Sequence, residues 1–372
     1  MESETLFYPR PKSRFGHRFV NMKITLAVLT VALGFVFCVP AVRAQETGRK
    51  VDAAFREETI ESIAKLLKER YTYPEIAEKM EAELRMRQKR GDYDRVADGD
   101  EFAKILTDHL RGVFDDKHMR VSYSAKPIPE RSSANGAPTA DEIRQARINQ
   151  GRENFGVVKL EVLPGNVGVM QINYFAPLDW ARDTYTAAFN YLGNTDALII
   201  DARWNRGSMD IETMPFFSGY LFDKPAEFGD IFVRERNEKR ILMTAAEVPG
   251  KRYGNKPVFV LTSGRTASGA EAFVKAMQRL KRATIIGETT RGATMPGGTV
   301  RVNDHFVIWI STGRSATGTA QNENRGTPPD ITVPVADALN EAHRHALDRL
   351  TQSADAGWKE ELTKIRAGLS SN

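Results

Sequence analysis

The sequence has very little cysteine, few histidines, and no local motif for a metal ion or a nucleotide. Cys38 is the single cysteine, and six histidines are spread over 372 residues. A disulfide within the chain is therefore excluded, because it requires two cysteines. No HExxH segment, Cys/His cluster or glycine-rich phosphate loop is present. We expect neither a metal site nor any other cofactor, since such segments are the usual way of binding these groups.

The chain also has almost no net charge when residues 1–44 are left out of the count. The formal net charge is +5. Residues 1–44 hold six Lys or Arg and two acidic residues, which leaves 47 basic against 46 acidic residues in the rest of the chain. Nucleic-acid binding requires a basic surface. We therefore expect no nucleic-acid partner.

Residues 1–44 have the pattern of a secretory signal peptide. Lys23 precedes the apolar run ITLAVLTVALGFVFCVPAV, and the small residues Val42 and Ala44 fit a signal peptidase site. We expect cleavage after Ala44, a periplasmic or secreted location, and no membrane attachment after cleavage. The alternative is an uncleaved N-terminal anchor, because the run is nearly long enough to span a bilayer.

The chain is long enough for two or three structural units, and the first that we predict is a small helical bundle over residues 45–117. Three amphipathic segments with short connections indicate it. The second segment begins at Pro74 and ends at Gly91, which are typical start and stop residues of a helix, and the third follows Asp98. Residues 118–153 predict a strand and then a polar linker or flap with a short helical pattern.

Residues 154–335 predict an α/β core, because strands and helices alternate along this segment. The clearest unit is an apolar strand at Val258–Leu261, a helical pattern over residues 268–280, and a second strand at Ala283–Gly287. Such a β–α–β unit belongs to a parallel sheet. Residues 336–372 predict a C-terminal helix and tail.

Ser268 lies where the first strand of this unit passes into the helix. Free backbone N–H groups and the positive end of the helix dipole meet at such a place, and both suit a nucleophile that forms an oxyanion. The same position is typical of an N-cap serine, and by position alone the cap is the commoner role.

A serine nucleophile needs a base and an oxyanion hole. Among the histidines, His118 is the candidate base, because it lies at the junction of bundle and core beside Asp115 and Asp116. Gly269 and Gly207 follow strands of the predicted sheet, whose carboxyl ends carry the sites of α/β proteins. Their N–H groups are candidate oxyanion donors, although a turn glycine is the simpler interpretation of Gly207.

Four segments resemble the tail-specific, or C-terminal processing, serine peptidases. Residues 201–207, DARWNRG, resemble the D-x-R-x-N-x-G element of that family. Residues 262–271, TSGRTASGAE, are similar to its nucleophile turn. Two later signatures are resembled by residues 287–290, GETT, and 326–331, GTPPDI. The similarity runs over residues 154–335 in family order, which implies a crotonase-like α/β core and favours Ser268 as nucleophile over Ser268 as cap.

Within that family the chain resembles the branch of the tricorn core and the interphotoreceptor retinoid-binding protein. Ala293 occupies the position of the lysine in the serine–lysine dyad of other members, and there is no room for their inserted PDZ domain. The resemblance implies a histidine base at His118 and a supporting glutamate at Glu323. Lys117 stands where tricorn has a serine, so Asp115 or Asp116 can share the task of orienting the histidine.

We therefore predict an exported serine peptidase, either an endopeptidase or a carboxyl-terminal processing peptidase. It would hydrolyse a peptide or unfolded protein through an acyl-enzyme, without a cofactor. The predicted catalytic residues are Ser268, His118 and Glu323, and the predicted oxyanion donors are Gly207 and Gly269.

The alternative prediction is a non-catalytic protein on the same scaffold, which would bind peptides or apolar ligands near Phe216 and Phe217. Acyl-CoA chemistry, which this fold also hosts, is a weaker third alternative. The sequence leaves the oligomeric state open.

Overall fold

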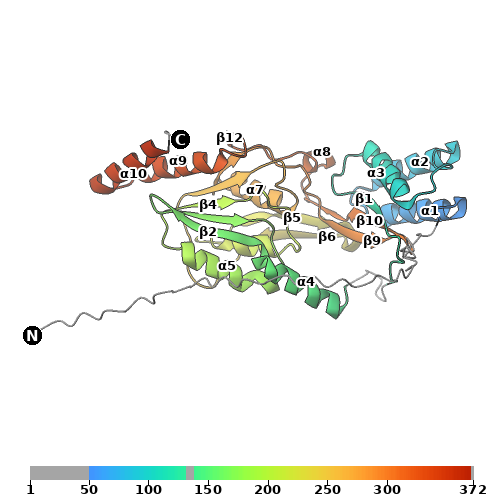
Figure 1. Ribbon diagram of the computed structural model, residues 1–372, viewed down its shortest axis with the longest axis horizontal. Helices are drawn as coiled ribbons and strands as arrows, with labels where there is room; N and C mark the ends of the chain where they lie inside the picture. The colour runs from blue at the N-terminus through green and yellow to red at the C-terminus, as the bar shows by residue number, and fades with distance from the viewer. Residues whose placement is uncertain (1–49, 131–137, 370–372) are drawn as a thin grey trace, which may run out of the picture. The chain divides into compact units, whose positions relative to one another are not determined.

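The computed structural model describes residues 50–130 and 138–369 (Figure 1). The predicted signal peptide, residues 1–44, lies outside the described residues. Residues 46–372 form one compact unit. None of the described helices is long and apolar enough to cross a membrane.

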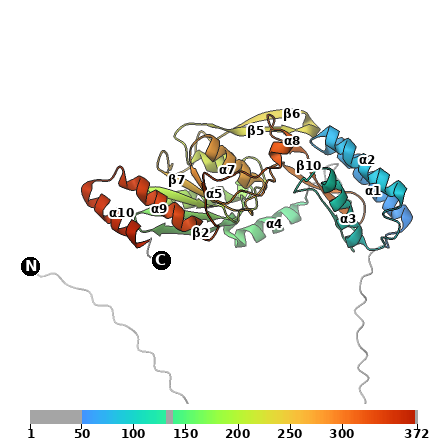
Figure 2. The same ribbon diagram turned by 90° about the horizontal axis from the view of Figure 1, so that it is seen from above.

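Three helices form the N-terminal bundle, as the sequence predicts (Figure 2). They are α1 (Ala53–Arg70), α2 (Pro74–Arg90) and α3 (Gly99–Val113). Local signals set their ends. The Asp52 and Asp98 carboxylates accept hydrogen bonds from the first turns of α1 and α3 at 2.9 and 2.8 Å. Gly91 ends α2 with a φ of 82°, a left-handed conformation that glycine adopts without strain.

A three-stranded sheet in the order β1-β10-β9 packs against this bundle. Its strands are β1 (Arg120–Tyr123), β9 (Gly297–Arg301) and β10 (Phe306–Ser311). Phe306, Ile308 and Ile310 on alternate positions of β10 are buried in the same apolar cluster as α1–α3. The predicted strand after the bundle is thus present, and its partner is a hairpin that the sequence-based division placed inside residues 154–335. The hairpin packs on the bundle because this contact buries its apolar face.

A six-stranded sheet forms the core, in the order β12-β8-β7-β4-β3-β2 (Figure 1). β2 (Val157–Leu163) and β3 (Val167–Ile172) are antiparallel. The other pairs are parallel, which includes the predicted unit of two strands around Ser268. The remaining strands are β4 (Ala197–Asp201), β7 (Val258–Thr262), β8 (Thr284–Gly287) and β12 (Ile331–Thr332).

Helices cover both apolar faces of this sheet. One cluster joins the sheet to α5 (Leu178–Leu192), α6 (Thr213–Gly219) and α7 (Gly269–Arg279). Another joins it to α9 (Ala338–Thr351) and α10 (Ala356–Gly368). Because both faces are covered, strands such as β4 and β7 are buried along their whole length.

The other elements connect the core to the bundle. β5 (Glu227–Val233), β6 (Glu238–Met243) and β11 (Gly313–Arg314) form a small sheet in the order β11-β5-β6. At its turn Arg234 donates to the carbonyl oxygens of Tyr71 and Lys68 at the end of α1. The short elements are α4 (Ala140–Arg152), α8 (Ala320–Glu323), and 3-10 helices at Asn154–Gly156 and Arg234–Arg236.

One expectation about the core needs correction. Phe216 and Phe217 are buried and pack on aromatic neighbours in the core, so they offer no surface to the apolar ligand that the alternative prediction placed there. The predicted C-terminal tail contains a second helix, α10.

Candidate active site

Ser268 lies between β7 and α7 in a strained backbone conformation. Its φ and ψ are 56° and −127°, a region that residues with a Cβ rarely adopt and that costs about 1–3 kcal/mol. Ser268 occupies the N-cap position of α7, in the S-x-x-E arrangement of a capping box with Glu271. The Glu271 N–H donates to the Ser268 carbonyl oxygen at 2.9 Å.

The carboxylate of Glu271 holds this turn in place. It is fully buried and accepts the Ser268 N–H at 3.0 Å. It also accepts the Thr290 hydroxyl at 2.5 Å, Gly292 N–H at 2.6 Å and Ala293 N–H at 2.7 Å. Four donors compensate the cost of burying a charge, and together they tie the nucleophile turn to residues 290–293.

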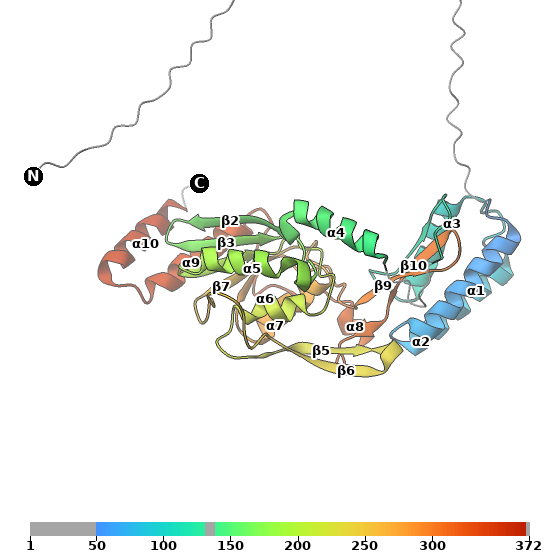
Figure 3. The same ribbon diagram turned by 90° about the horizontal axis from the view of Figure 1, so that it is seen from below.

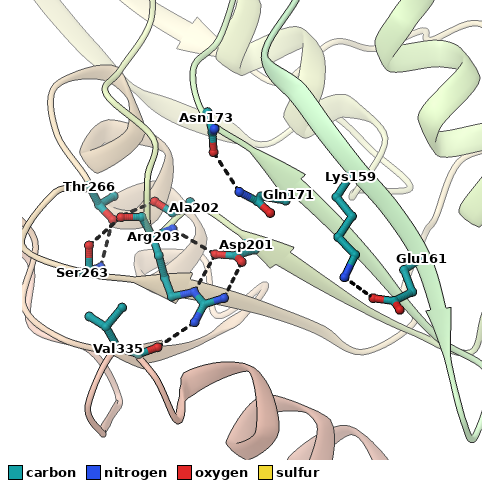
Figure 4. Close-up of polar contacts among 10 residues, drawn as sticks. All are labelled: Lys159, Glu161, Gln171, Asn173, Asp201, Ala202, Arg203, Ser263, Thr266 and Val335. Atoms are coloured by element: carbon teal, nitrogen blue, oxygen red, sulfur yellow. Dashed lines mark hydrogen bonds and ion pairs between the residues drawn. The ribbon is translucent and has the colours of Figure 1, made fainter. Parts of the chain in front are cut away.

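The loop after β4 is fixed against the same turn (Figure 4). Arg203 donates to both carboxylate oxygens of Asp201, at 2.9 and 2.7 Å, and both side chains are largely buried. The carbonyl oxygens of Arg203 and Ala202 accept the hydroxyls of Ser263 and Thr266 at 2.5 and 2.8 Å. The Asp–Arg pair is therefore a bidentate ion pair that positions the loop.

The predicted oxyanion donors lie beside Ser268. Gly207 has a φ of 120°, and a Cβ built on it would come within 2.7 Å of the Ser268 Cβ. A Cβ on Gly269 would meet the Ser208 nitrogen at 2.8 Å. The Gly207 N–H donates to Asn205 Oδ1 at 2.9 Å. The Gly269 N–H remains a predicted oxyanion donor. The Gly207 N–H can donate to an oxyanion only if its hydrogen bond to Asn205 breaks. Among the described residues, the N–H groups of Ser208 and Gly269 have no hydrogen-bond acceptor.

His118 sits in a turn that is clamped from two sides. Arg111 of α3 donates to the carbonyl oxygens of Lys117 and Met119 at 3.0 and 2.8 Å. The buried Asp116 carboxylate accepts the His118 N–H at 3.0 Å. Lys117 donates to the Arg291 carbonyl oxygen at 2.7 Å, which joins this turn to the loop that Glu271 holds.

Trp309 of β10 orients the His118 ring. The two rings stack with centroids 4.4 Å apart and planes 22° apart. The Nδ1 atom is buried and has no hydrogen-bond partner among the described residues. Burial lowers the pKa of His118, as do Arg291 and Arg111, while Asp116 and Glu271 act in the opposite direction. Burial disfavours the charged imidazolium, so it favours the neutral form of the ring.

One cavity of about 1040 Å³ is lined by His118, Ser268, Gly269 and Glu323. Its walls also carry apolar side chains, among them Ile211, Met214, Phe228 and Ile231. A concave, mostly apolar space with a few convergent polar groups is typical of a substrate site. The structure thus brings three predicted catalytic side chains to one space. Within the described ranges, no group of His, Cys, Asp and Glu side chains is placed to hold a metal ion.

Two protein-family models match this chain. The model of peptidase family S41 matches residues 166–333, and the model of the N-terminal domain of peptidase S41 in eukaryotic IRBP matches residues 53–155. The chain belongs to peptidase family S41. This confirms the predicted family and the coarse function, a serine peptidase whose substrate is a peptide or protein.

Solved structures of other proteins share the fold at low sequence identity. A candidate peptidase from Parabacteroides merdae is 16% identical, with a TM-score of 0.52 over 75% of this chain and 90% of that chain. Mature CPAF complexed with lactacystin is 14% identical, with a TM-score of 0.50 over 84% and 98%. The tricorn protease is a weaker match, 12% identical with a TM-score of 0.47 over 85% and 37%. The first two support the predicted α/β core with a helical N-terminal region.

In this S41 peptidase, Ala293 occupies the position of the dyad lysine and supports the nucleophile through its backbone. Ala293 has no side chain that can take a proton, but its N–H donates to Glu271, which in turn holds Ser268. Glu271 is not among the site residues predicted from the sequence. The S-x-x-E spacing at the start of α7 was the available signal, because a glutamate there can reach back to the first residue of a helix.

Glu323 lies in the S41 site without a hydrogen bond to His118. Its carboxylate accepts the Ser315 N–H at 2.7 Å and the Thr294 hydroxyl at 2.5 Å. The adjacent Asn324 donates to the Asp115 carbonyl oxygen, which connects the segment of Glu323 to that of His118. The carboxylates that raise the pKa of His118 belong to Asp116 and Glu271. The orienting role of Glu323 therefore stays a prediction.

Proposed function

We propose that this chain hydrolyses peptide bonds through an acyl-enzyme on Ser268, with His118 as general base. The observation that carries the proposal is that a serine in a strained turn and a largely buried histidine line the same cavity. A serine hydroxyl is a weak nucleophile until an adjacent base activates it, and only the neutral form of the imidazole is a base.

The steps follow from these groups. Ser268 Oγ attacks the carbonyl carbon of the scissile bond while His118 takes the hydroxyl proton. The negative oxygen that results is stabilised by backbone N–H groups, for which Gly269 and Ser208 are placed, or Gly207 after its N–H leaves Asn205. The imidazolium then gives its proton to the leaving amine, the C–N bond breaks, and a water molecule activated by His118 hydrolyses the ester.

Glu323 is the finer part of the proposal. Its carboxylate lines the cavity with His118, so its proposed role is to orient the imidazole from across this space. The cavity suits an endopeptidase or a carboxyl-terminal processing peptidase. Peptides with a free or an amidated C-terminus distinguish these two, because only a processing enzyme depends on the terminal carboxylate.

Covalent labelling by a fluorophosphonate tests the proposal, because this reagent reacts with an activated serine. A protein that keeps the scaffold only to bind peptides would leave the reagent unreacted. The binding alternative has lost its proposed apolar site, since Phe216 and Phe217 are buried in the core.

The pH dependence should show the burial of His118. The general base works only when neutral, and burial lowers its pKa. Activity should therefore persist below the ordinary histidine value of about 6.5 and fall as the pH drops through the lowered pKa. The acid limb of kcat/KM measures this. Replacing Trp309 by alanine would expose the ring and move the limb upward, and a wild-type limb above the ordinary value would contradict the assignment.

Export is a further part of the proposal, supported by the apolar run and the Val42 and Ala44 pair. Exported protein should begin at Gln45, because signal peptidase cleaves after small residues at these positions. N-terminal sequencing of the purified protein checks this. A soluble exported species that keeps residues 23–44 would show that the segment is not removed.

A further inference from the structure

β2 is the outermost strand of the six-stranded sheet, and one of its edges is free. The sheet ends at β2, which among the described residues pairs only with β3 (Figure 3). Val158 and Val162 on this strand are 47% and 45% exposed. An exposed strand edge with apolar side chains is a template for pairing with another strand. The free edge of β2 can therefore accept a further strand.

The sequence of β2 is self-complementary in charge. Residues 158–162 read VKLEV, with Leu160 at the centre, a lysine before it and a glutamate after it. Lys159 and Glu161 point to the same face and form an ion pair at 2.6 Å, with side chains 49% and 38% exposed. The strand is regularly paired with β3 from Lys159 to Leu163, and a register shift lies before Lys159.

We infer that a second copy of this chain pairs with the free edge of β2, antiparallel and centred on Leu160. This register places Lys159 opposite the partner's Glu161, and Glu161 opposite the partner's Lys159. It also places Val158 opposite the partner's Val162. Directly opposed residues of antiparallel strands are close neighbours, and opposite charges there are favourable.

Twofold symmetry explains why one short segment is sufficient to form the proposed interface. In a symmetric dimer each contact occurs twice, so a self-complementary patch meets itself. The two lysine–glutamate pairs between the copies would replace the one pair within each strand, and the half-exposed valines would be covered. A lysine on an edge strand ordinarily discourages pairing, but here the glutamate two residues away supplies its partner in the second copy. This inference does not depend on the peptidase activity.

Sedimentation velocity on the purified chain tests the pairing between about 1 and 200 µM, the range in which an interface of this limited size associates. Wild-type protein should show a concentration-dependent dimer. Lys159→Glu opposes like charges at two places and should weaken the dimer at least about tenfold. The double variant Lys159→Glu with Glu161→Lys restores opposite charges in this register and should restore the dimer.

Lys239→Glu provides a matched control, because Lys239 is an exposed lysine on β6, the edge strand of the small sheet β11-β5-β6. It should leave the dimer unchanged, and circular dichroism should show that all variants are folded. A monomer at every concentration overturns the inference. So does a dimer that is equally strong in all variants, or a double variant that is folded and monomeric. Protection of β2 amides from hydrogen exchange only when peptide is added would assign the edge to a peptide.

Discussion

Replacing Ser268 by alanine should abolish peptide hydrolysis. The hydroxyl is the proposed nucleophile, and the other two hydroxyls of this turn, on Ser263 and Thr266, donate to backbone carbonyl oxygens. Loss of a peptidase serine lowers kcat by about six orders of magnitude, to what binding and the oxyanion hole alone provide. The measurement is the turnover of an unfolded polypeptide, together with fluorophosphonate labelling located by mass spectrometry.

Ser353→Ala is the matched control, because the Ser353 hydroxyl contacts only the end of α9, at the Leu350 carbonyl oxygen. This variant should hydrolyse and label as the wild type does. If Ser268→Ala keeps its activity while folded, or if the reagent modifies a different serine, the nucleophile has been assigned incorrectly. If no serine reacts and the protein binds peptide, it is a binding protein on the same scaffold.

Replacing His118 by alanine should lower turnover by about 10²–10⁴-fold, which is the usual contribution of a positioned histidine to proton transfer. The fold should persist, because the ring is held by stacking on Trp309 and makes no buried hydrogen bond through Nδ1. Fluorophosphonate should then label Ser268 much more slowly. Single-turnover rates and labelling rates are the measurements.

His345→Ala controls for a general effect of losing a histidine. His345 lies on α9 and pairs with Glu341 at 3.2 Å, away from the cavity that contains Ser268. Its loss should change neither rate. A His118→Ala variant with nearly full activity would show that another group takes the proton, and the S41 serine would then need a base that the sequence does not indicate.

Much of the local structure could be predicted from the sequence. The limits of α2 follow from Pro74 and Gly91, which act through their own backbone preferences. The β7–α7–β8 unit follows from the change from a short β-branched run to helical periodicity. Ser268, Gly207 and Gly269 could be placed together because loops at the carboxyl ends of neighbouring parallel strands meet.

The sequence by itself therefore determined most helices and strands, the family and the position of the serine, because these depend on neighbours in the chain. Tertiary structure alone decided which distant groups meet. The β9–β10 hairpin packs on the bundle and brings Trp309 onto His118. The Glu271 carboxylate accepts hydrogen bonds from residues 290–293. The Glu323 carboxylate accepts hydrogen bonds from Ser315 and Thr294. Burial of apolar surface and satisfaction of buried polar groups act across the whole chain, and no local pattern encodes their outcome.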